Sequence, residues 1–272
     1  MNLTWAYLTD TGMQRGSNED ATLALVTNLD TVGERDLVGL FAVSDGMGGK
    51  EKGEVAAKIA VKTLGELFLQ RALRHNLGTV RDVPGYGARV PDEDRELLEN
   101  PAAFMKMAVQ EANRRIFRLR DGGEHLSMGA TLTAAIIRND VLTLGHVGDC
   151  RCYFLDQNSF RILTQDHSMV CELVKQGVLT EEEARVHPRK NILSRSLGSK
   201  EEVEVDTYIT VIPRGIRLMI CTDGLYNMVT DETIRNVMCR HAHPKEQAAI
   251  LVKEANLAGG KDNVTAMMIH FH

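Results

Sequence analysis

Runs of apolar residues that stop abruptly at a polar or charged residue recur along this chain of 272 residues. The run at 36–44 (DLVGLFAVS) is one, and similar runs occupy 216–224 and 263–271. Short apolar runs of this length, bounded by glycine and aspartate, predict buried strands. Residues 3–9 and 21–27 have the same extended character and predict two more strands.

Helical periodicity marks a second set of segments. Apolar residues between positions 50 and 73 follow i, i+3, i+4, i+7 spacing, which predicts one long helix with a single buried face. Asn100 and Pro101 supply an N-cap and a first-turn proline for another helix, which reaches Leu119. Three more helices are expected, at 168–176, at 180–185 and from Pro244 to Gly259.

The two sets of segments are arranged in blocks. Residues 129–156 contain two or three strands, the first two joined by a tight turn at Asn139. Residues 75–99 combine glycine and proline with little periodicity and predict a long surface loop. Strands in both halves of the chain, with helices in separate blocks, favour an α+β fold with antiparallel sheets. We predict one domain over residues 1–272.

Composition excludes some classes of function. The net charge is −5, from 32 basic and 37 acidic side chains, which argues against nucleic-acid binding through phosphate contacts. No segment approaches the roughly 20 apolar residues that span a bilayer. The first ten residues contain no basic stretch followed by an apolar one, so no secretory signal is expected. We therefore expect a cytoplasmic protein that binds neither nucleic acid nor membrane.

Cysteine and histidine suggest neither a zinc site nor a disulfide framework. The five cysteines include no C-x2-C pair and are expected to be reduced thiols. The histidine pairs His241 with His243 and His270 with His272 have no third ligand nearby in the sequence, so we predict solvated surface side chains.

Four aspartates stand at the ends of apolar strands. Asp45 follows FAVS, Asp223 follows LMICT, Asp149 follows LTLGHVG, and Asp262 precedes NVTAMMIHF. Each is compatible with an ordinary turn, because Asp-Gly is among the strongest hairpin signals. If the strand ends converge, however, the carboxylates repel one another and resist ionising together. A divalent cation that prefers oxygen ligands, Mg²⁺ or Mn²⁺, would remove that difficulty.

Eight short motifs punctuate the chain from residue 10 to residue 269. They are DTGMQRGSNED, VSDGMGGKEKGEVAA, MGATLTAA, GHVGDCRCY, LTQDHS, HPRKNILSRSLG, CTDGLYNMV and KDNVTAMMI. In order and spacing they resemble the motifs of the metal-dependent protein phosphatases, the protein phosphatase 2C (PPM) family, in its bacterial form. The resemblance covers almost the whole chain. It implies a sandwich of two antiparallel β-sheets flanked by helices, in α-β-β-α layers.

The resemblance also implies a metal site at one edge of the sandwich. Asp45 would bridge two Mn²⁺ or Mg²⁺ ions, and the carbonyl of Gly46 would bind one of them. Asp223 and Asp262 would complete the ligands of the second ion. Asp149, together with Asp223, would hold a weaker third ion.

Further implied roles belong to residues around the ions. Glu19 and Asp20 would orient metal-bound water. Asn227 stands where relatives carry an acidic residue; it keeps a carbonyl acceptor but loses a charge, which lowers the expected metal affinity. Arg15 would bind the substrate phosphate through its planar, permanently charged guanidinium. Met47 replaces a histidine that is proposed to protonate the leaving group in animal members, so a metal-bound water would take over that task.

The implied reaction is hydrolysis of phosphoserine and phosphothreonine in proteins. Two ions about 3.5–4 Å apart lower the pKa of a shared water, and the resulting hydroxide attacks phosphorus in line, without a phosphoenzyme. Ser44 and Cys150 are then packing residues, although Cys150 replaces the family's usual serine. The expected partners are phosphorylated proteins, the products of serine/threonine kinases.

Three alternatives stay open on the sequence alone. A protein of this fold could serve a regulatory partner switch by dephosphorylating one dedicated protein, or it could be a binding module with weak catalysis. A metal-dependent phosphodiesterase is a weaker third alternative. Residues 168–190 resemble the mobile flap beside the active site of bacterial members, although two solvated helices would have the same amphipathic pattern.

Overall fold

Two five-stranded antiparallel sheets form the centre of the protein. The structure, a computed structural model, describes residues 2–31, 34–48, 51–79, 100–121 and 128–272. The first sheet has the strand order β1-β12-β11-β8-β9 and the second has the order β10-β7-β6-β3-β2, while β4 pairs with β5. The strands are β1 (Leu3–Asp10), β2 (Ala21–Thr31), β3 (Glu34–Ser44), β4 (Gly46–Met47), β5 (Gly129–Ala130), β6 (Leu132–Arg138), β7 (Val141–Val147), β8 (Arg151–Leu155), β9 (Phe160–Ile162), β10 (Asp206–Val211), β11 (Arg217–Cys221) and β12 (Val264–Phe271).

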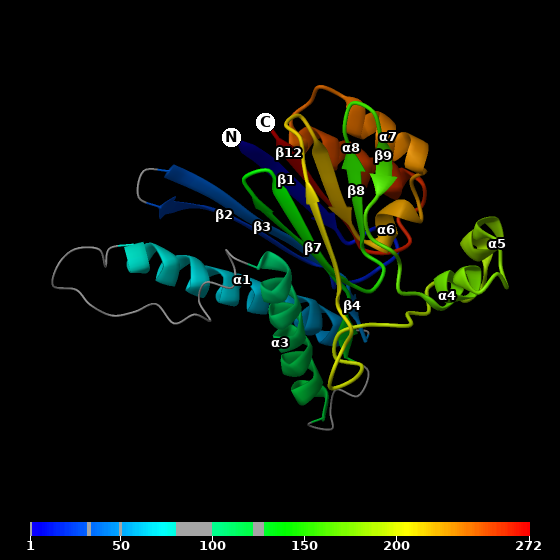
Figure 1. Ribbon diagram of the computed structural model, residues 1–272. Coiled ribbons are helices and arrows are strands. Elements are labelled where there is room, and N and C mark those ends of the chain that lie inside the picture. The colour runs from blue at the N-terminus through cyan, green and yellow to red at the C-terminus, as the bar shows by residue number, and fades with distance from the viewer. Residues whose placement is uncertain (1, 32–33, 49–50, 80–99, 122–127) are drawn as a thin grey trace.

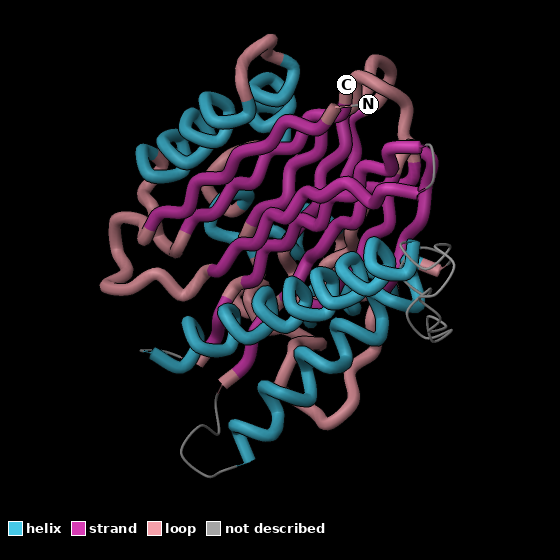
Figure 2. Tube along the Cα trace, turned by 90° about the vertical axis from the view of Figure 1, so that its left-hand side faces the viewer, coloured by secondary structure: helices cyan, strands magenta, loops and turns pink. Residues whose placement is uncertain are grey.

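Helices cover the outer faces of both sheets. The long helices α1 and α3 lie on the sheet that contains β2 and β7, whereas α7 and α8 lie on the sheet that contains β8 and β12 (Figure 1). Figure 2 shows the same layers from the side, with helices on both sides of the strands. The helices are α1 (Glu51–Thr79), α3 (Pro101–Asp121), α4 (Met169–Lys175), α5 (Glu181–Val186), α6 (Asp223–Tyr226), α7 (Asp231–Cys239) and α8 (Pro244–Leu257).

The central strands are apolar on both faces because each face meets another layer. In β3, Leu40 and Ala42 pack against the helices α1 and α3, while Phe41 and Val43 pack between the two sheets. The same alternation of side chains holds in β12, where Met267 joins the core between the sheets. Strands buried on both faces carry nearly continuous apolar runs, which explains the pattern in the sequence. The predicted α+β sandwich with α-β-β-α layers is confirmed.

Several predicted elements are confirmed and others need correction. The strands and the five helices expected above all form, with β6, β7 and β8 within residues 129–156, and the turn at Asn139 joins β6 to β7 with a φ of 52°. The prediction of a loop from residue 75 was wrong at its start, because α1 continues to Thr79; residues 80–99 lie outside the described part of the chain. His270 is buried rather than solvated, because its position in β12 places it beneath α8, where it contacts Gln247.

The topology brings three strand ends to one edge of the sandwich. β12 runs antiparallel to β11, so the start of β12 lies beside the end of β11, with Cys221 opposite Ala266. β1 pairs with β12 along its whole length, from Leu3 opposite Phe271 to Asp10 opposite Val264. The segments after β1 and β11 and the segment before β12 therefore meet.

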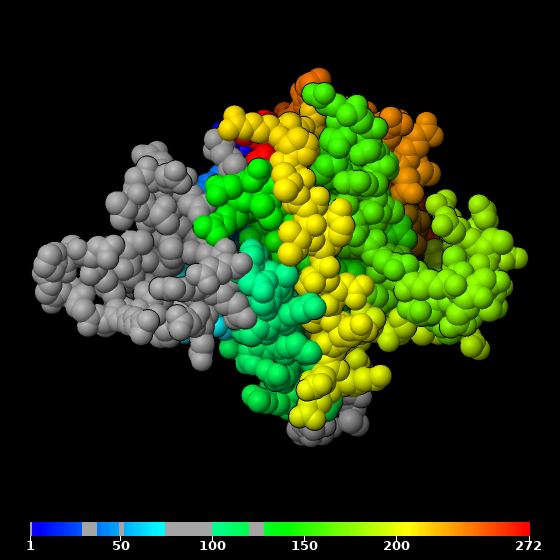
Figure 3. Space-filling view, viewed as in Figure 1, coloured from blue at the N-terminus to red at the C-terminus, as the bar shows by residue number. Residues whose placement is uncertain are grey.

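The helices α4 and α5 form a lobe beside this body. The lobe projects on one side in Figures 1 and 3, where it is yellow-green. Thr180 caps α5 with a complete capping box to Glu183. The two helices agree with the short helices predicted at 168–176 and 180–185. Among the helices that the structure describes, none has the length and apolar character that crossing a bilayer requires.

Candidate active site

The predicted acidic residues do gather at this edge, and their charges oppose one another. Asp45 follows β3 directly, and its pKa is raised well above the usual value by burial and then by the carboxylates of Asp20 and Asp223. Burial likewise raises the pKa of Asp149 to about 8, with a further contribution from Asp223. A set of carboxylates that resist ionisation together is poised to accept a cation.

Asp20 and Asp223 show the same effect. Burial raises the pKa of Asp20 to about 7, although hydrogen bonds from Thr265 and Thr222 favour its charged form. Burial and then the charge of Asp262 raise the pKa of Asp223 to about 6. One carboxylate oxygen of each, Asp20 Oδ1 and Asp223 Oδ1, is buried and has no hydrogen-bond partner within the described residues. Such oxygens are what a bound ion or its water would satisfy.

This edge offers few side chains that could bind a metal ion directly. Within the described ranges, no three Asp, Glu, His or Cys side chains are arranged to hold one metal ion. Mg²⁺ and the chemically similar Mn²⁺ commonly use one or two carboxylates and keep several waters. The donor set, which is carboxylate and carbonyl oxygen without sulfur, therefore fits ions of that kind.

Close backbone packing fixes the position of Gly46. A Cβ atom at Gly46 would overlap the carbonyl oxygen of Gly53 in the first turn of α1, and one at Gly53 would overlap Glu19 Oε2. Glycine at both positions therefore lets α1 approach the end of β3 and lets Glu19 enter beside it. Burial raises the pKa of Glu19, and the charge of Arg15 opposes that rise.

Arg15 contacts a predicted metal ligand. Its Nη2 donates to Asp262 Oδ2 at 2.7 Å, and the Arg15 side chain is 56% exposed. The bond raises the pKa of Arg15 further above its ordinary value. The sequence-based assignment of Arg15 to phosphate binding did not anticipate this ion pair, because it joins residues 247 positions apart.

Asn263 was missed by the sequence reasoning, although it follows Asp262 directly. Its Oδ1 accepts from the backbone N–H of Glu19 at 2.8 Å, and its Nδ2 donates to the carbonyls of Thr11 and Ser17. One amide side chain thus holds the segment that carries Arg15 and Glu19 against the start of β12. Asn263 lies in the motif KDNVT, but an asparagine beside an aspartate is ordinary in a loop and does not by itself indicate a structural role.

Asp20 is held by two hydroxyl groups that were also missed. Thr222 and Thr265 donate to its Oδ2, at 3.0 and 2.6 Å. These threonines lie directly after β11 and in β12, so two separate segments fix one carboxylate. Asp20 was expected to orient water, and its free Oδ1 leaves one oxygen for that purpose.

Asn227 connects Asp223 to the segment after the lobe. Its Nδ2 donates to Asp223 Oδ2 at 3.1 Å, and its Oδ1 accepts from Lys190 Nζ at 2.9 Å. The amide therefore uses its donor on the carboxylate and its acceptor on the lysine, as an aspartate could not. The positive charge of Lys190 favours the ionised form of Asp223.

The turn that carries Asp149 has its own support. Tyr226 donates its hydroxyl to the backbone carbonyl of Asp149 at 3.0 Å, and the Arg151 guanidinium lies 3.7 Å from the centre of the Tyr226 ring. Arg151 is bound by Asp166 through two hydrogen bonds of 2.7 and 3.0 Å. Arg151 therefore pairs with Asp166, which leaves the Asp149 carboxylate available at the site.

Ser44 and Cys150 are packing residues, as expected. Both are fully buried; Ser44 donates to the carbonyl of Thr131 at 2.6 Å, and Cys150 lies 3.0 Å from the Thr131 hydroxyl. Burial and the charges of Asp45 and Asp149 raise the pKa of the Cys150 thiol well above its ordinary value. A thiol that resists ionisation is a poor nucleophile. All five cysteines are free thiols.

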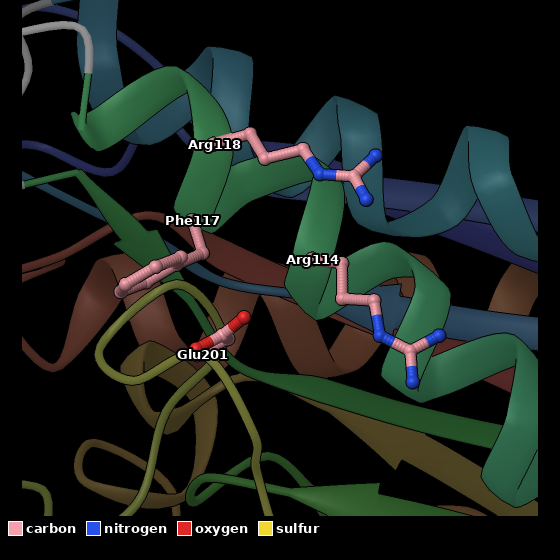
Figure 4. Close-up of a pocket in the computed structure, with 4 residues that line it drawn as sticks. All are labelled: Arg114, Phe117, Arg118 and Glu201. Carbon is pink, nitrogen blue, oxygen red and sulfur yellow. The ribbon is translucent and has the colours of Figure 1, made fainter.

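The surface also has a pocket of about 330 Å³ that contains none of the predicted site residues (Figure 4). Three of its lining residues come from α3 and one from the loop before β10: Arg114, Phe117, Arg118 and Glu201.

Comparison with known proteins identifies the family of this chain. Residues 15–258 match the family model described as protein phosphatase 2C. The chain belongs to the protein phosphatase 2C family. The serine/threonine phosphatase stp of Listeria welshimeri is 33% identical over 264 residues, which are 97% of this chain and 94% of that protein.

Solved structures of the phosphatase 2C type extend the comparison. The serine/threonine phosphatase of S. agalactiae matches with a TM-score of 0.79 and 30% identity, over 100% of both chains. The catalytic domain of the phosphatase PstP, solved in complex with 2 manganese ions, matches with a TM-score of 0.75 and 29% identity, over 98% of this chain and 97% of that one. The predicted family and the predicted enzyme class, a serine/threonine phosphoprotein phosphatase, are confirmed.

Proposed function

We propose that this phosphatase hydrolyses phosphoserine and phosphothreonine with the aid of Mn²⁺ or Mg²⁺ bound at Asp45, Asp223 and Asp262. Support comes from one observation above all: burial and mutual repulsion raise the pKa values of Asp45, Asp149 and Asp223 together. Bound cations would relieve that repulsion. The relative solved with manganese supports the same choice of ion.

The proposed arrangement has two ions that share Asp45, with the Gly46 carbonyl as a further ligand. A third, weaker ion would bind between Asp149 and Asp223. When bound, the ions supply positive charge for the phosphoryl oxygens and lower the pKa of the attacking water. Two buried carboxylate oxygens, on Asp20 and Asp223, have no hydrogen-bond partner in the part of the chain that the structure describes, and they fit this oxygen-only chemistry.

Arg15 would hold the substrate phosphate. A guanidinium has five N–H donors, so Arg15 can keep its bond to Asp262 while it donates to phosphate oxygens. Its exposed side chain reaches solvent, where a phosphorylated segment would arrive. Glu19 and Asp20 would accept hydrogen bonds from the attacking water and its neighbours, and so fix the direction of attack.

Protonation of the leaving oxygen needs a group other than Met47. A thioether is at most a weak acceptor and has no proton to give. Water at the site would therefore supply the proton. The substrate's serine or threonine oxygen would leave without a side-chain acid.

We further propose that residues 1–272 act as one domain and that residues 168–190 serve as a flap beside the site. Lys190 at the end of this segment bonds to Asn227, which bonds to Asp223, so movement of the lobe would reach a metal ligand. Phosphorylated proteins made by serine/threonine kinases are the proposed partners.

A turnover assay tests the proposal. Initial rates on a phosphothreonine peptide should disappear after chelation with EDTA and return when Mn²⁺ is added back. A diester, bis(p-nitrophenyl) phosphate, should be hydrolysed much more slowly than the monoester. Undiminished peptide hydrolysis at a measured metal content near zero would exclude the metal-assisted reaction, and a preference for the diester would change the substrate class.

A further inference from the structure

We propose that His167 is a positioning residue for Asp149 and for the weak third ion, a role that rests on the function proposed for Asp149. His167 lies in the motif LTQDHS, to which no part of the reaction has been assigned. Its side chain is 2% exposed and lies between the turn that carries Asp149 and the first residue of β10, Asp206.

His167 binds both backbone groups of Gly148, the residue before Asp149. The backbone N–H of His167 donates to the Gly148 carbonyl at 2.7 Å, and its ring Nδ1 accepts from the Gly148 N–H at 3.0 Å. A backbone N–H only donates, so Nδ1 carries no proton and the ring proton is on Nε2. Nε2 then donates to Asp206 Oδ2 at 3.1 Å. Arg195 Nη1 also lies 3.1 Å from Nε2, and because a protonated Nε2 cannot accept a hydrogen bond, this guanidinium bonds to Asp206 instead.

Asp206 is itself held in place. Arg195 Nη1 donates to Asp206 Oδ1 at 2.7 Å, and Arg195 Nη2 donates to Glu204 at 2.8 Å. The order of bonds is therefore Arg195 to Asp206, Asp206 to the His167 ring, and the ring to Gly148. A ring fixed at both nitrogens has one orientation, which makes it a defined support for the peptide that it contacts.

The Gly148 peptide needs such support because its conformation is unusual. Its φ is +109°, and a Cβ at this position would lie 2.5 Å from the Thr131 Cβ. Glycine has many accessible conformations, so the turn is not fixed by its own backbone. The direction of this peptide sets where the Asp149 side chain begins, and a change there moves the carboxylate away from Asp223.

The neighbouring residue holds the other side of the same turn. Asp166 binds Arg151, Arg151 lies against the Tyr226 ring, and Tyr226 donates to the Asp149 carbonyl. Two consecutive residues therefore secure the peptides on both sides of Asp149. A buried histidine that served only the core would not need contacts directed at one acidic turn.

The same short segment begins the lobe. Ser168 caps α4 by accepting from the Cys171 N–H, and the His167 carbonyl accepts from the Ser194 N–H at 2.9 Å. The base of the proposed flap and the support of Asp149 are therefore one continuous stretch of chain. Residues 166–168 therefore connect the turn that carries Asp149 to the proposed flap.

Two substitutions at one position separate positioning from packing. His167→Asn places an amide oxygen near the position of Nδ1, so it keeps an acceptor for Gly148 and loses the bond to Asp206. His167→Gln extends towards Asp206 and removes the acceptor beside Gly148. His270→Asn is the matched control. His270 is also buried and bonds to Gln247, and it lies near the end of β12, whereas Asp262 precedes the start of that strand. Asp149→Ala is the reference variant, because it should show the Mn²⁺ titration of a protein that has lost the weak site completely.

Calorimetric titration with Mn²⁺ is the primary measurement, accompanied by thermal unfolding and by kcat and KM on a phosphopeptide. We expect His167→Gln to weaken the weakest Mn²⁺ site by about tenfold or more, the usual effect of losing an outer support of a ligand. Its kcat should fall while KM changes little. His167→Asn keeps the acceptor for Gly148 but not the bond to Asp206, so it should weaken that site less than His167→Gln does. His270→Asn should change only the unfolding midpoint.

The outcomes are distinguishable. Equal Mn²⁺ affinities in His167→Gln and His167→Asn, or an intact weak site in His167→Gln when Asp149→Ala has lost it, would overturn the positioning role and leave the proposed function untouched. A weak site that persists in Asp149→Ala would overturn the function proposed for Asp149 and the role of His167 with it. If the His167 variants do not fold, Asp206→Ala at the half-exposed end of the network should weaken the same site, and an unchanged affinity there would count against the proposal.

Discussion

Replacing Asp149 with asparagine should stabilise the metal-free protein at neutral pH, although it removes a proposed metal ligand. Asp149 is only 7% exposed, and its pKa is raised to about 8 by burial and by the charges of Asp223 and Asp166. A carboxyl whose pKa is higher in the folded than in the unfolded state holds more protons when folded. Its ionisation therefore costs stability, and the cost grows as the pH rises between the two pKa values.

The size of the effect follows from those two values. The ordinary pKa of the carboxyl is 3.8, which represents the unfolded chain. Each unit of difference corresponds to about 1.4 kcal/mol, so at pH 7 the cost reaches on the order of 4 kcal/mol. Asparagine carries no charge and avoids this cost. The free energy of unfolding of Asp149→Asn should exceed that of the wild type by up to this amount at pH 7, and the difference should disappear towards pH 4.

Urea unfolding in EDTA at several pH values between 4 and 8 measures the difference. Asp156→Asn is the control of opposite sign, because hydrogen bonds from the backbone of Asn158 and Ser159 lower the pKa of Asp156. Its carboxylate stabilises the fold above the ordinary pKa, and that stability is lost as the pH falls, so the asparagine variant should be the less stable one at pH 7. A pH-independent difference for Asp149→Asn, or lower stability than the wild type throughout, would refute the reasoning.

Three further predictions concern metal and phosphate binding. Asp45→Asn should abolish turnover and weaken both primary Mn²⁺ sites together, with an unchanged circular dichroism spectrum; full activity would make Asp45 a simple turn residue. Arg15→Ala should raise KM for a phosphopeptide roughly tenfold or more, the usual value of a charged hydrogen bond, and should lower kcat less; the opposite split would assign Arg15 to the transition state. Asn227→Asp should tighten Mn²⁺ binding in calorimetry, because it adds a charge beside Asp223; an unchanged affinity would show that Lys190 neutralises the new carboxylate.

Much of the architecture could be predicted from local pattern. The runs at 36–44 and 263–271 are apolar because both faces of β3 and β12 are covered, and such runs are visible without a structure. β10 was not predicted, because it lies at the edge of its sheet and none of its residues is buried, so its sequence DTYITV contains no long apolar run. α7 was not predicted either, since its nine residues are too short for a strong periodic signal, and its cap Thr230 alone does not define a helix.

The sequence was enough to predict the charged residues of the candidate site, but not the neutral residues that hold them in place. Aspartates at strand ends are conspicuous in a sequence, and the structure does bring Asp45 and Asp223 together. The supports of these residues come from distant segments: Thr265 binds Asp20 across 245 positions, and Asn263 binds Glu19 across 244. Threonine and asparagine are common surface residues, so only the tertiary fold shows which of them hold the site.

The pairing of β1 with β12 has a consequence for the folding of the protein. Thr9 lies opposite Thr265, and the segment with Arg15 and Glu19 is fastened by Asn263. Contacts between residues so far apart form late, because closing a long loop costs entropy before the contact repays it. The segment that carries Arg15 and Glu19 therefore reaches its final position only when the two ends of the described fold, β1 and β12, have paired.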